Sequence, residues 1–150
     1  MNYFYLCSYP IEAGSVILPG NWGRILQFYP LINQNNWWLL LREMVFENIR
    51  LNEFSKLPSR LNSIFLCKDY NNIVDFKNKT GRILDLIYEV ELLDGKALMH
   101  KACLSVFDQE KDGDLRTLEE KARIYWSGKD IKRLEIVTTS SIRIISQHKA

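Results

Sequence analysis

The segment from Asp108 to Glu119 spaces its acidic side chains like a calcium-binding loop. Such a loop supplies oxygen ligands at positions one, three, five and twelve and carries glycine at position six. Two features argue against calcium: Glu110 stands where Asp or Asn is usual, and the preceding run, residues 97–107, resembles a strand where an EF-hand needs a helix. We therefore expect a polar turn in which Asp112 or Asp114 caps the helix that follows.

Glu135 is the second candidate for chemistry. In the segment of residues 133–137 it is a carboxylate between apolar neighbours, Leu134 on one side and Ile136 and Val137 on the other. A charged residue flanked by apolar ones on a strand ordinarily faces solvent, and that interpretation stands beside a functional one. Histidine offers little, since only His100 and His148 are present and His148 lies in a tail expected to fray. We expect His100, beside Lys101 on a predicted strand, to be a half-buried structural residue rather than a base.

The three cysteines, Cys7, Cys67 and Cys103, are widely spaced and have no histidine at zinc spacing. We expect buried, reduced thiols and no metal site. The N-terminus lacks the pattern of a signal peptide, and no apolar stretch approaches the roughly 20 residues that cross a bilayer. The sequence therefore predicts a cytoplasmic protein with no membrane partner.

Length and composition predict one soluble domain. The chain has 150 residues, of which 47% are apolar and 25% charged, the usual balance of a globular protein. We expect a single domain over residues 1–150. The net charge of +2 is too small to predict a surface for polyanions, so nothing in the composition indicates nucleic acid as a partner.

The longest helix is expected over residues 36–54, where apolar residues recur at helical spacing. Asn35 or Asn36 is available as its N-cap. The expected apolar side consists of Leu41, Met44, Val45, Ile49 and Phe54.

Two further helices are expected, one brief and one regular. The brief helix follows Asp69, and the regular one spans residues 115–126 and ends at Gly128. The apolar side of the regular helix consists of Leu118, Ala122, Tyr125 and Trp126. The chain therefore predicts about three helices.

Strands and turns occupy most of the remaining chain. Short apolar runs predict strands at residues 3–8, 63–67, 134–138 and 142–145. Runs 83–93 and 97–107 are joined at Asp94-Gly95, which predicts a β-hairpin. Because strands and helices mix without regular alternation, the sequence favours an α+β fold.

The stretch after the first strand indicates a small ligand. It is a long loop punctuated by glycine and proline, from Pro10 to Gly23, and a loop of that length in a compact domain is usually functional. A short strand that runs into such a loop begins several nucleotide-binding folds. Residues 5–8 and this loop resemble the first strand and loop of ADP-ribosyltransferase-like proteins.

The resemblance extends in patches along the chain. Residues 58–66 look like the second strand of that fold, and the turn at residues 125–128 with the strands after it is similar to a family of short uncharacterised bacterial proteins grouped with it. The resemblance implies a compact single domain with mixed, mostly antiparallel strands in a split sheet. It also implies NAD as the substrate.

Residue by residue, the resemblance implies a site on three strands. Tyr5 and Ser8 would flank the cleft, while Ser63 and Phe65 would face the nicotinamide. Glu135 would be the catalytic carboxylate that stabilises the positive charge formed on the ribose as the glycosidic bond breaks. A preorganised charge of this kind stabilises the transition state more than the ground state.

Leu6 departs from the family pattern, which has histidine or arginine at this position. Leucine cannot donate a hydrogen bond to a ribose hydroxyl, so Arg24 or Arg60 would supply the polar anchor. We favour Arg60, because it directly precedes the matched strand. The structural alternative is a surface arginine that bridges to the region of Glu53.

Three functions follow as hypotheses. The first is a mono-ADP-ribosyltransferase that transfers ADP-ribose from NAD to a protein, nucleic acid or small molecule, as a toxin or defence factor does. The second is an inactive member of the same fold that binds a nucleotide or a protein. The third uses Trp37 or Trp38, which cannot both face one core, in an oligomer or in an interface with an inhibitory, antitoxin-like partner.

Overall fold

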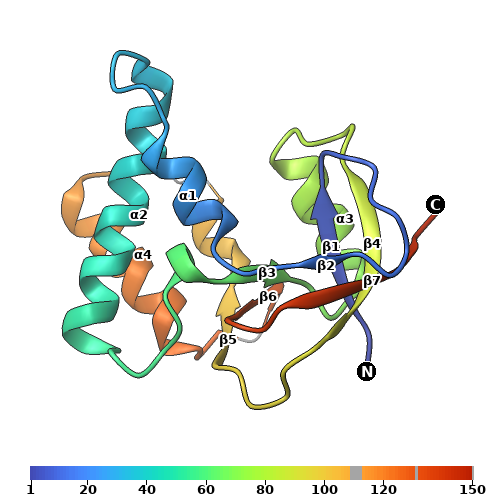
Figure 1. Ribbon diagram of the computed structural model, residues 1–150. Coiled ribbons are helices and arrows are strands. Elements are labelled where there is room, and N and C mark those ends of the chain that lie inside the picture. Colours follow the sequence, from blue (N-terminus) through green and yellow to red (C-terminus); the bar gives the residue numbers. More distant parts are fainter. Residues whose placement is uncertain (109–112, 131, 150) are drawn as a thin grey trace.

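Two antiparallel sheets form the centre of the protein in the computed structural model, which describes residues 1–108, 113–130 and 132–149 (Figure 1). The larger sheet has the strand order β1-β4-β7-β2, and the smaller has the order β3-β6-β5. The strands are β1 (Tyr3–Cys7), β2 (Val16–Ile17), β3 (Ile64–Leu66), β4 (Leu86–Leu92), β5 (Met99–Cys103), β6 (Leu134–Thr138) and β7 (Ile142–Gln147). The α+β class and the single compact domain are confirmed, and every described strand pair is antiparallel.

Four α-helices are described, one more than the sequence predicts. They are α1 (Asn21–Gln27), α2 (Gln34–Glu53), α3 (Tyr70–Lys79) and α4 (Leu115–Ser127), with 3-10 turns η1 (Arg60–Asn62) and η2 (Leu104–Phe107). The additional helix, α1, begins within the predicted loop, which ended at Gly23, and continues through residues for which no element was predicted. Its glycine, Gly23, allows the helix to lie directly on η1, because a Cβ there would come within 2.2 Å of the carbonyl oxygen of Leu61.

Helix α2 begins earlier than predicted, and only part of its predicted apolar side is buried. Its N-cap is Asn33, whose side chain accepts a hydrogen bond from the backbone N–H of Asn35, so the predicted caps at Asn35 and Asn36 were wrong. Met44 and Leu41 of the predicted apolar side are exposed. Ile49 of that side is buried, and Val45 and Phe54 pack against the core. The other buried residues of the helix are Glu43, Phe46 and Arg50. Charged side chains on the inner face explain why apolar spacing alone placed part of that face wrongly.

The boundaries of α3 and α4 agree with the sequence. Asp69 caps α3, accepting a hydrogen bond of 2.7 Å from the N–H of Asn71. Asp114 caps α4 through the N–H of Thr117, and Gly128 ends that helix in the left-handed conformation, with φ 64°. The buried residues of α4 are the four predicted ones, Leu118, Ala122, Tyr125 and Trp126.

The predicted hairpin at Asp94-Gly95 was wrong, because β4 and β5 belong to different sheets. The chain around Ser140 passes from the small sheet, as β6, into the large sheet, as β7. The β4–β5 connection follows it: the N–H of Leu93 donates to the carbonyl of Ser141, and the N–H of Asp94 donates to Oγ of Ser140. Strand β5 therefore pairs with β6, and β4 pairs with β7, instead of β4 and β5 pairing with each other.

Three apolar clusters hold these layers together. Helices α2 and α4 lie side by side and pack on the small sheet, where the indole N–H of Trp126 donates to the carbonyl of Phe46. A second cluster joins the two sheets and includes Tyr88 and Ile136. A third lies between α3 and β1 and includes Leu6. The region where the sheets meet lies between the α2–α4 pair and α3, and this is where the cavity described next is found.

Candidate functional site

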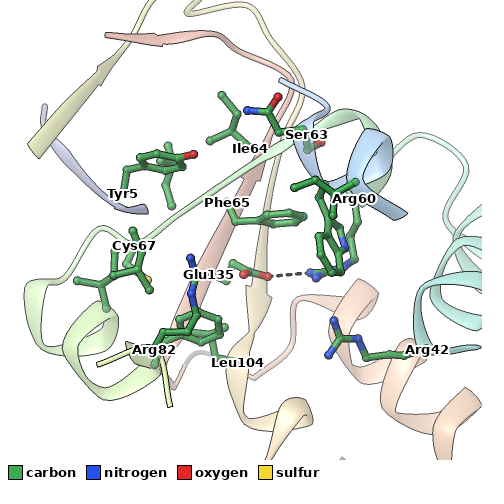
Figure 2. Close-up of a pocket in the computed structure, with 17 residues that line it drawn as sticks. Tyr5, Arg42, Arg60, Ser63, Ile64, Phe65, Cys67, Arg82, Leu104 and Glu135 are labelled. Carbon is green, nitrogen blue, oxygen red and sulfur yellow. Dashed lines mark hydrogen bonds and ion pairs between the residues drawn. The ribbon is translucent and has the colours of Figure 1, made fainter. Parts of the chain in front are cut away.

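A cavity of about 280 Å³ lies where β1, β3, β6 and α1 meet (Figure 2). Tyr5 and Arg82 lie on one side of it and Arg42 and Arg60 on the other, with Phe65 and Glu135 between them. Most of the remaining wall is apolar. A few polar groups converging in an apolar hollow are typical of small-ligand sites.

Glu135 reaches this cavity from the central strand of the small sheet. It lies on β6, opposite Ala102 of β5, and only 6% of the residue is exposed. The solvent-facing interpretation of Glu135 was therefore wrong. A buried carboxylate requires partners, because desolvation of an unpaired charge is costly.

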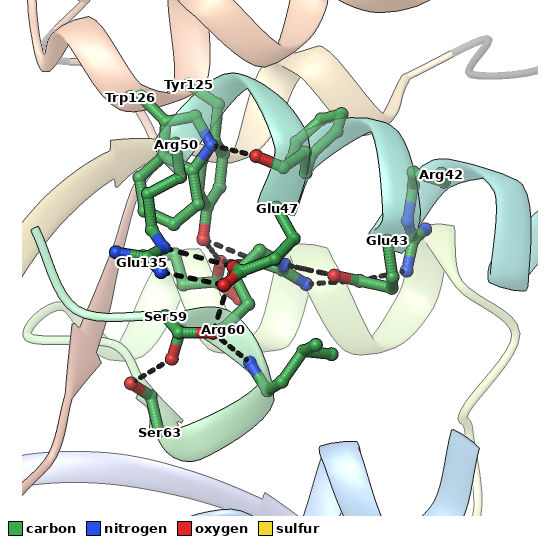
Figure 3. A network of polar contacts seen from close by, with 12 residues as sticks. Arg42, Glu43, Glu47, Arg50, Ser59, Arg60, Ser63, Tyr125, Trp126 and Glu135 are labelled. Carbon is green, nitrogen blue, oxygen red and sulfur yellow. Dashed lines mark hydrogen bonds and ion pairs between the residues drawn. The ribbon is translucent and has the colours of Figure 1, made fainter. Parts of the chain in front are cut away.

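Arg60 and Tyr125 are the partners of Glu135 (Figure 3). Nη1 of Arg60 donates to Oε2 of Glu135 at 2.9 Å, and the hydroxyl of Tyr125 donates to the same oxygen at 2.7 Å. Arg60 Nη1 also donates to the hydroxyl oxygen of Tyr125. Burial raises the pKa of the Tyr125 hydroxyl well above its usual value, so this group stays protonated and remains a hydrogen-bond donor.

Glu43 of α2 binds the other side of Arg60. Arg60 Nε donates to Glu43 Oε2 at 3.0 Å, and Nη2 donates to Oε1 at 3.1 Å. Burial raises the pKa of the Glu43 carboxyl, but the charge and hydrogen bonds of Arg60 and the charge of Arg42 outweigh it and lower the pKa overall. Burial lowers the pKa of Arg60, yet the charge of Glu43, the charge of Glu135 and the hydrogen bonds to Glu43 raise it well above the usual value. Glu43 and Arg60 are thus an ionised pair despite their burial.

Helix α2 positions the segment that carries Arg60. One turn after Glu43, Glu47 accepts hydrogen bonds from Arg50 and from the Ser59 hydroxyl, the latter at 2.9 Å. The Ser59 hydroxyl in turn accepts from the N–H of Leu61 and caps η1. Two glutamates of one helix face therefore fix both ends of the Ser59–Arg60 dipeptide.

Arg60 was predicted to anchor the cofactor, but most of its donors are already committed to protein groups. Glu43, Tyr125 and Glu135 receive hydrogen bonds from all three of its nitrogens, and the ring of Phe65 lies 4.5 Å from its guanidinium carbon. A guanidinium held in this way neutralises and orients Glu135. The alternative, a surface bridge to the region of Glu53, was wrong, since Arg60 is buried and Arg123 binds that carboxylate.

The other predicted residues divide between the cavity and an adjoining groove. Tyr5, Ser63 and Phe65 line the cavity, although the Ser63 hydroxyl donates to the carbonyl of Ser59 at 2.6 Å. Ser8 and Arg24 lie outside it and line the groove.

The groove measures about 570 Å³ and shares Tyr5, Asn21 and Arg82 with the cavity wall. Ser8 Oγ donates to Asp85, which also accepts from Arg82 Nε at 2.6 Å. Arg82 therefore lies at the junction of cavity and groove, held by a nearly buried carboxylate.

Leu6 is both a wall of the cavity and part of the α3 core cluster. Its hydrocarbon side chain has no hydrogen-bonding atom and therefore supplies no polar group to the cavity. Tyr5, beside it on β1, is largely desolvated, and burial raises its pKa to about 12. The first strand thus contributes one apolar wall and one neutral phenol.

Glu43, Tyr125 and Arg82 belong to the site and were missed by the sequence argument. Tyr125 was assigned only to the apolar side of its helix, where it does lie, but its hydroxyl reaches Glu135. Glu43 had one usable signal, since it is a charged residue three positions from Phe46 on a face that also includes Ile49. A charge on a buried helix face predicts a buried partner.

The remaining candidates lie elsewhere. His100 is buried rather than half-buried; its Nε2 donates to the carbonyl of Tyr125, and burial lowers its pKa. Trp37 is exposed, whereas Trp38 packs against the α2–α4 core, as expected for two adjacent tryptophans. Of the cysteines, Cys67 lines the cavity and burial raises its pKa to about 12.

The calcium-like segment is only partly described, since residues 109–112, including the alternative cap Asp112, lie outside the described residues. Its first acidic residue, Asp108, is bound by Arg133 at 2.6 Å. In the described part of the chain, no three His, Cys, Asp or Glu side chains are placed to hold a metal ion. No helix there is long and apolar enough to cross a membrane.

Comparison with known proteins adds one family. A family model described as "Protein of unknown function (DUF2441)" matches residues 24–150. This range includes the Glu43–Arg60–Glu135 cluster, whereas Tyr5 and Ser8 of the first strand precede it. No curated protein matches the chain.

Proposed function

We propose that this chain, which belongs to the DUF2441 family of proteins of unknown function, is an ADP-ribosyltransferase-like protein that binds NAD in the cavity beside Glu135. The observation that carries the proposal is the position of this carboxylate. It is buried, it is held by Arg60 and Tyr125, and it lines the same hollow as Tyr5 and Phe65.

The proposed reaction breaks the bond between ribose C1′ and the nicotinamide nitrogen. The bonding electrons leave with the nicotinamide, which becomes neutral, and C1′ develops oxocarbenium character. The Glu135 carboxylate stabilises that charge, as a fixed anion in a water-poor site does effectively. The acceptor nucleophile then forms a bond to C1′ and gives up its proton to solvent.

The dimensions of the site support a binding mode in which NAD is divided between the cavity and the adjoining groove. A cavity of about 280 Å³ is just below the range of ligand sites, about 300 to 1,000 Å³, and suits the nicotinamide end alone. The adjoining groove is open and carries Arg24 and Arg82. Arginines bind phosphate oxygens well, so these two residues, rather than Arg60, are proposed to face the diphosphate.

The test is release of labelled nicotinamide from NAD, with and without cell lysate as a source of acceptor. Glu135→Gln keeps the size of the side chain but removes its charge, and we expect it to lower release about 100-fold or more. Glu91→Gln is the matched control, because Glu91 is a surface residue of β4 paired with Arg143. No release by the wild-type protein, or equal release by the Glu135→Gln variant, would refute the proposal.

One observation favours a second function, a binding module without turnover. Arg60 already neutralises Glu135, so part of the negative charge available to an oxocarbenium ion is compensated. Calorimetry with NAD separates the two: binding without nicotinamide release assigns the module. The transferase proposal carries three further predictions. They are an acceptor for the ADP-ribose, an inhibitory or antitoxin-like protein partner, and a cytoplasmic location.

A further inference from the structure

The two oxygens of Glu135 have different surroundings. Oε2 accepts hydrogen bonds from Arg60 and Tyr125. Oε1 accepts none from the described residues, while the residue itself lines the cavity. A carboxylate with one saturated oxygen directs its remaining basicity through the other. In the proposed reaction, Oε1 is therefore the atom available to the ribose.

This asymmetry depends on how Arg60 divides its donors. A guanidinium has two edges that can bind a carboxylate with two parallel hydrogen bonds, and such bidentate pairs are the stronger ones. Arg60 uses its Nε–Nη2 edge for Glu43 and offers only Nη1 to Glu135. Glu43 therefore competes with Glu135 for the same cation.

We propose that Glu43 is a positioning residue that holds Arg60 away from full pairing with Glu135 and so keeps Oε1 open to the cavity. The inference rests on the function proposed above. Glu43 is itself 2% exposed and does not line the cavity, so it acts through Arg60 and not on a ligand. If Glu43 loses its charge, Glu135 is the only one of the two carboxylates left to Arg60. A second hydrogen bond from Arg60 to Glu135 would then occupy Oε1.

Glu43→Gln tests the proposal, because it keeps the side-chain size and removes the charge. A second charge-assisted hydrogen bond would compensate more of the charge of Glu135, so we expect kcat for nicotinamide release to fall roughly 10- to 100-fold, which corresponds to about 1.4–2.7 kcal/mol. KM should change little, since Glu43 does not line the cavity. Glu43→Asp keeps the charge and should restore part of kcat.

Glu53→Gln is the matched control. Glu53 is the last residue of α2, pairs with Arg123 at the surface, and tests loss of an ion pair of the same helix without altering the partners of Arg60. We expect it to leave kcat within about twofold of the wild type, because exposed ion pairs away from the site contribute little even to stability. An equal loss of kcat in both variants would overturn the positioning role.

A crystal structure of the Glu43→Gln variant decides the geometry whether or not NAD is turned over. Two hydrogen bonds from Arg60 to both oxygens of Glu135 are expected, and an unmoved Arg60 overturns the inference. If the wild-type protein releases no nicotinamide, the proposed function fails, while the crystal structure still decides whether Glu43 controls the position of Arg60.

Discussion

Replacing Arg60 with methionine tests how far the buried charge cluster stabilises the fold. Methionine approximates the length of the arginine stem and leaves the carboxylates of Glu43 and Glu135 without their shared cation. Both carboxylates are nearly inaccessible, with 3% and 8% of their side chains exposed. Removing one partner of a buried pair costs about 3–5 kcal/mol, because the remaining charge is left uncompensated.

That loss is large on the scale of a domain of this size, whose unfolding free energy is about 5–15 kcal/mol. Its pH dependence has a definite sign. In the wild type the pKa of Glu43 is lowered from its ordinary value of 4.5, so its stabilising effect is present above that pH and is lost as pH falls through the folded-state pKa.

In the Arg60→Met variant, burial remains but the main cause of the lowered pKa is gone. The folded-state pKa of Glu43 should then lie above its unfolded value, so the carboxyl takes up a proton on folding at mildly acidic pH. The variant recovers stability as pH falls, while the wild type gains none. The difference between the two proteins should therefore be largest near neutral pH and shrink toward about pH 4.

Urea unfolding followed by tryptophan fluorescence measures this difference at about pH 7.5 and about pH 5. Arg143→Met is the control, because Arg143 pairs with Glu91 on the surface of the large sheet and an exposed pair contributes at most about 1 kcal/mol. The reasoning fails if Arg60→Met costs no more than this control at neutral pH, or if its cost is the same at both pH values.

Two further predictions concern packing, and the same urea titration checks both. Gly23→Ala should lower the free energy of unfolding by about 1–3 kcal/mol, because the new Cβ would lie 2.2 Å from the carbonyl oxygen of Leu61. Gly95→Ala is the control, because a Cβ at that position would have no atom within 4 Å, and equal stability of the two variants would contradict the close approach of α1 to η1. Phe46→Ala should cost about 3–5 kcal/mol, since Phe46 is 1% exposed in the core between α2 and α4. Met44→Ala, two residues away and 71% exposed, should change stability by less than about 0.5 kcal/mol, and a comparable loss there would mean that the inner face of α2 is misassigned.

Local sequence patterns predicted the elements whose ends and buried faces are set by neighbouring residues. Helix α4 was found from the spacing of four apolar residues, with Asp114 as one of two proposed caps and Gly128 as its end. Strand β6 was found with its observed bounds. In both cases neighbouring residues on one face and a terminal cap carry the signal, so nearby sequence contains it.

Patterns failed where a distant segment decides the outcome. Asp94-Gly95 is a good hairpin sequence, yet the β6–β7 segment more than 40 residues away draws β4 and β5 into different sheets. Helix α1 was missed because it has only seven residues and depends on contact with η1. Apolar spacing likewise selected Met44 for burial, although the inner face of α2 carries Glu43.

The sequence by itself determined the α+β class, most elements and the candidate carboxylate Glu135, because these follow from composition and short-range periodicity. Only the tertiary structure decided that Glu135 is buried and that it shares Arg60 with Glu43. These partners lie 17 and 75 positions from Arg60 along the chain. Whether a charge faces water or a counter-charge depends on which distant surfaces cover it, and no local pattern of residues carries that information.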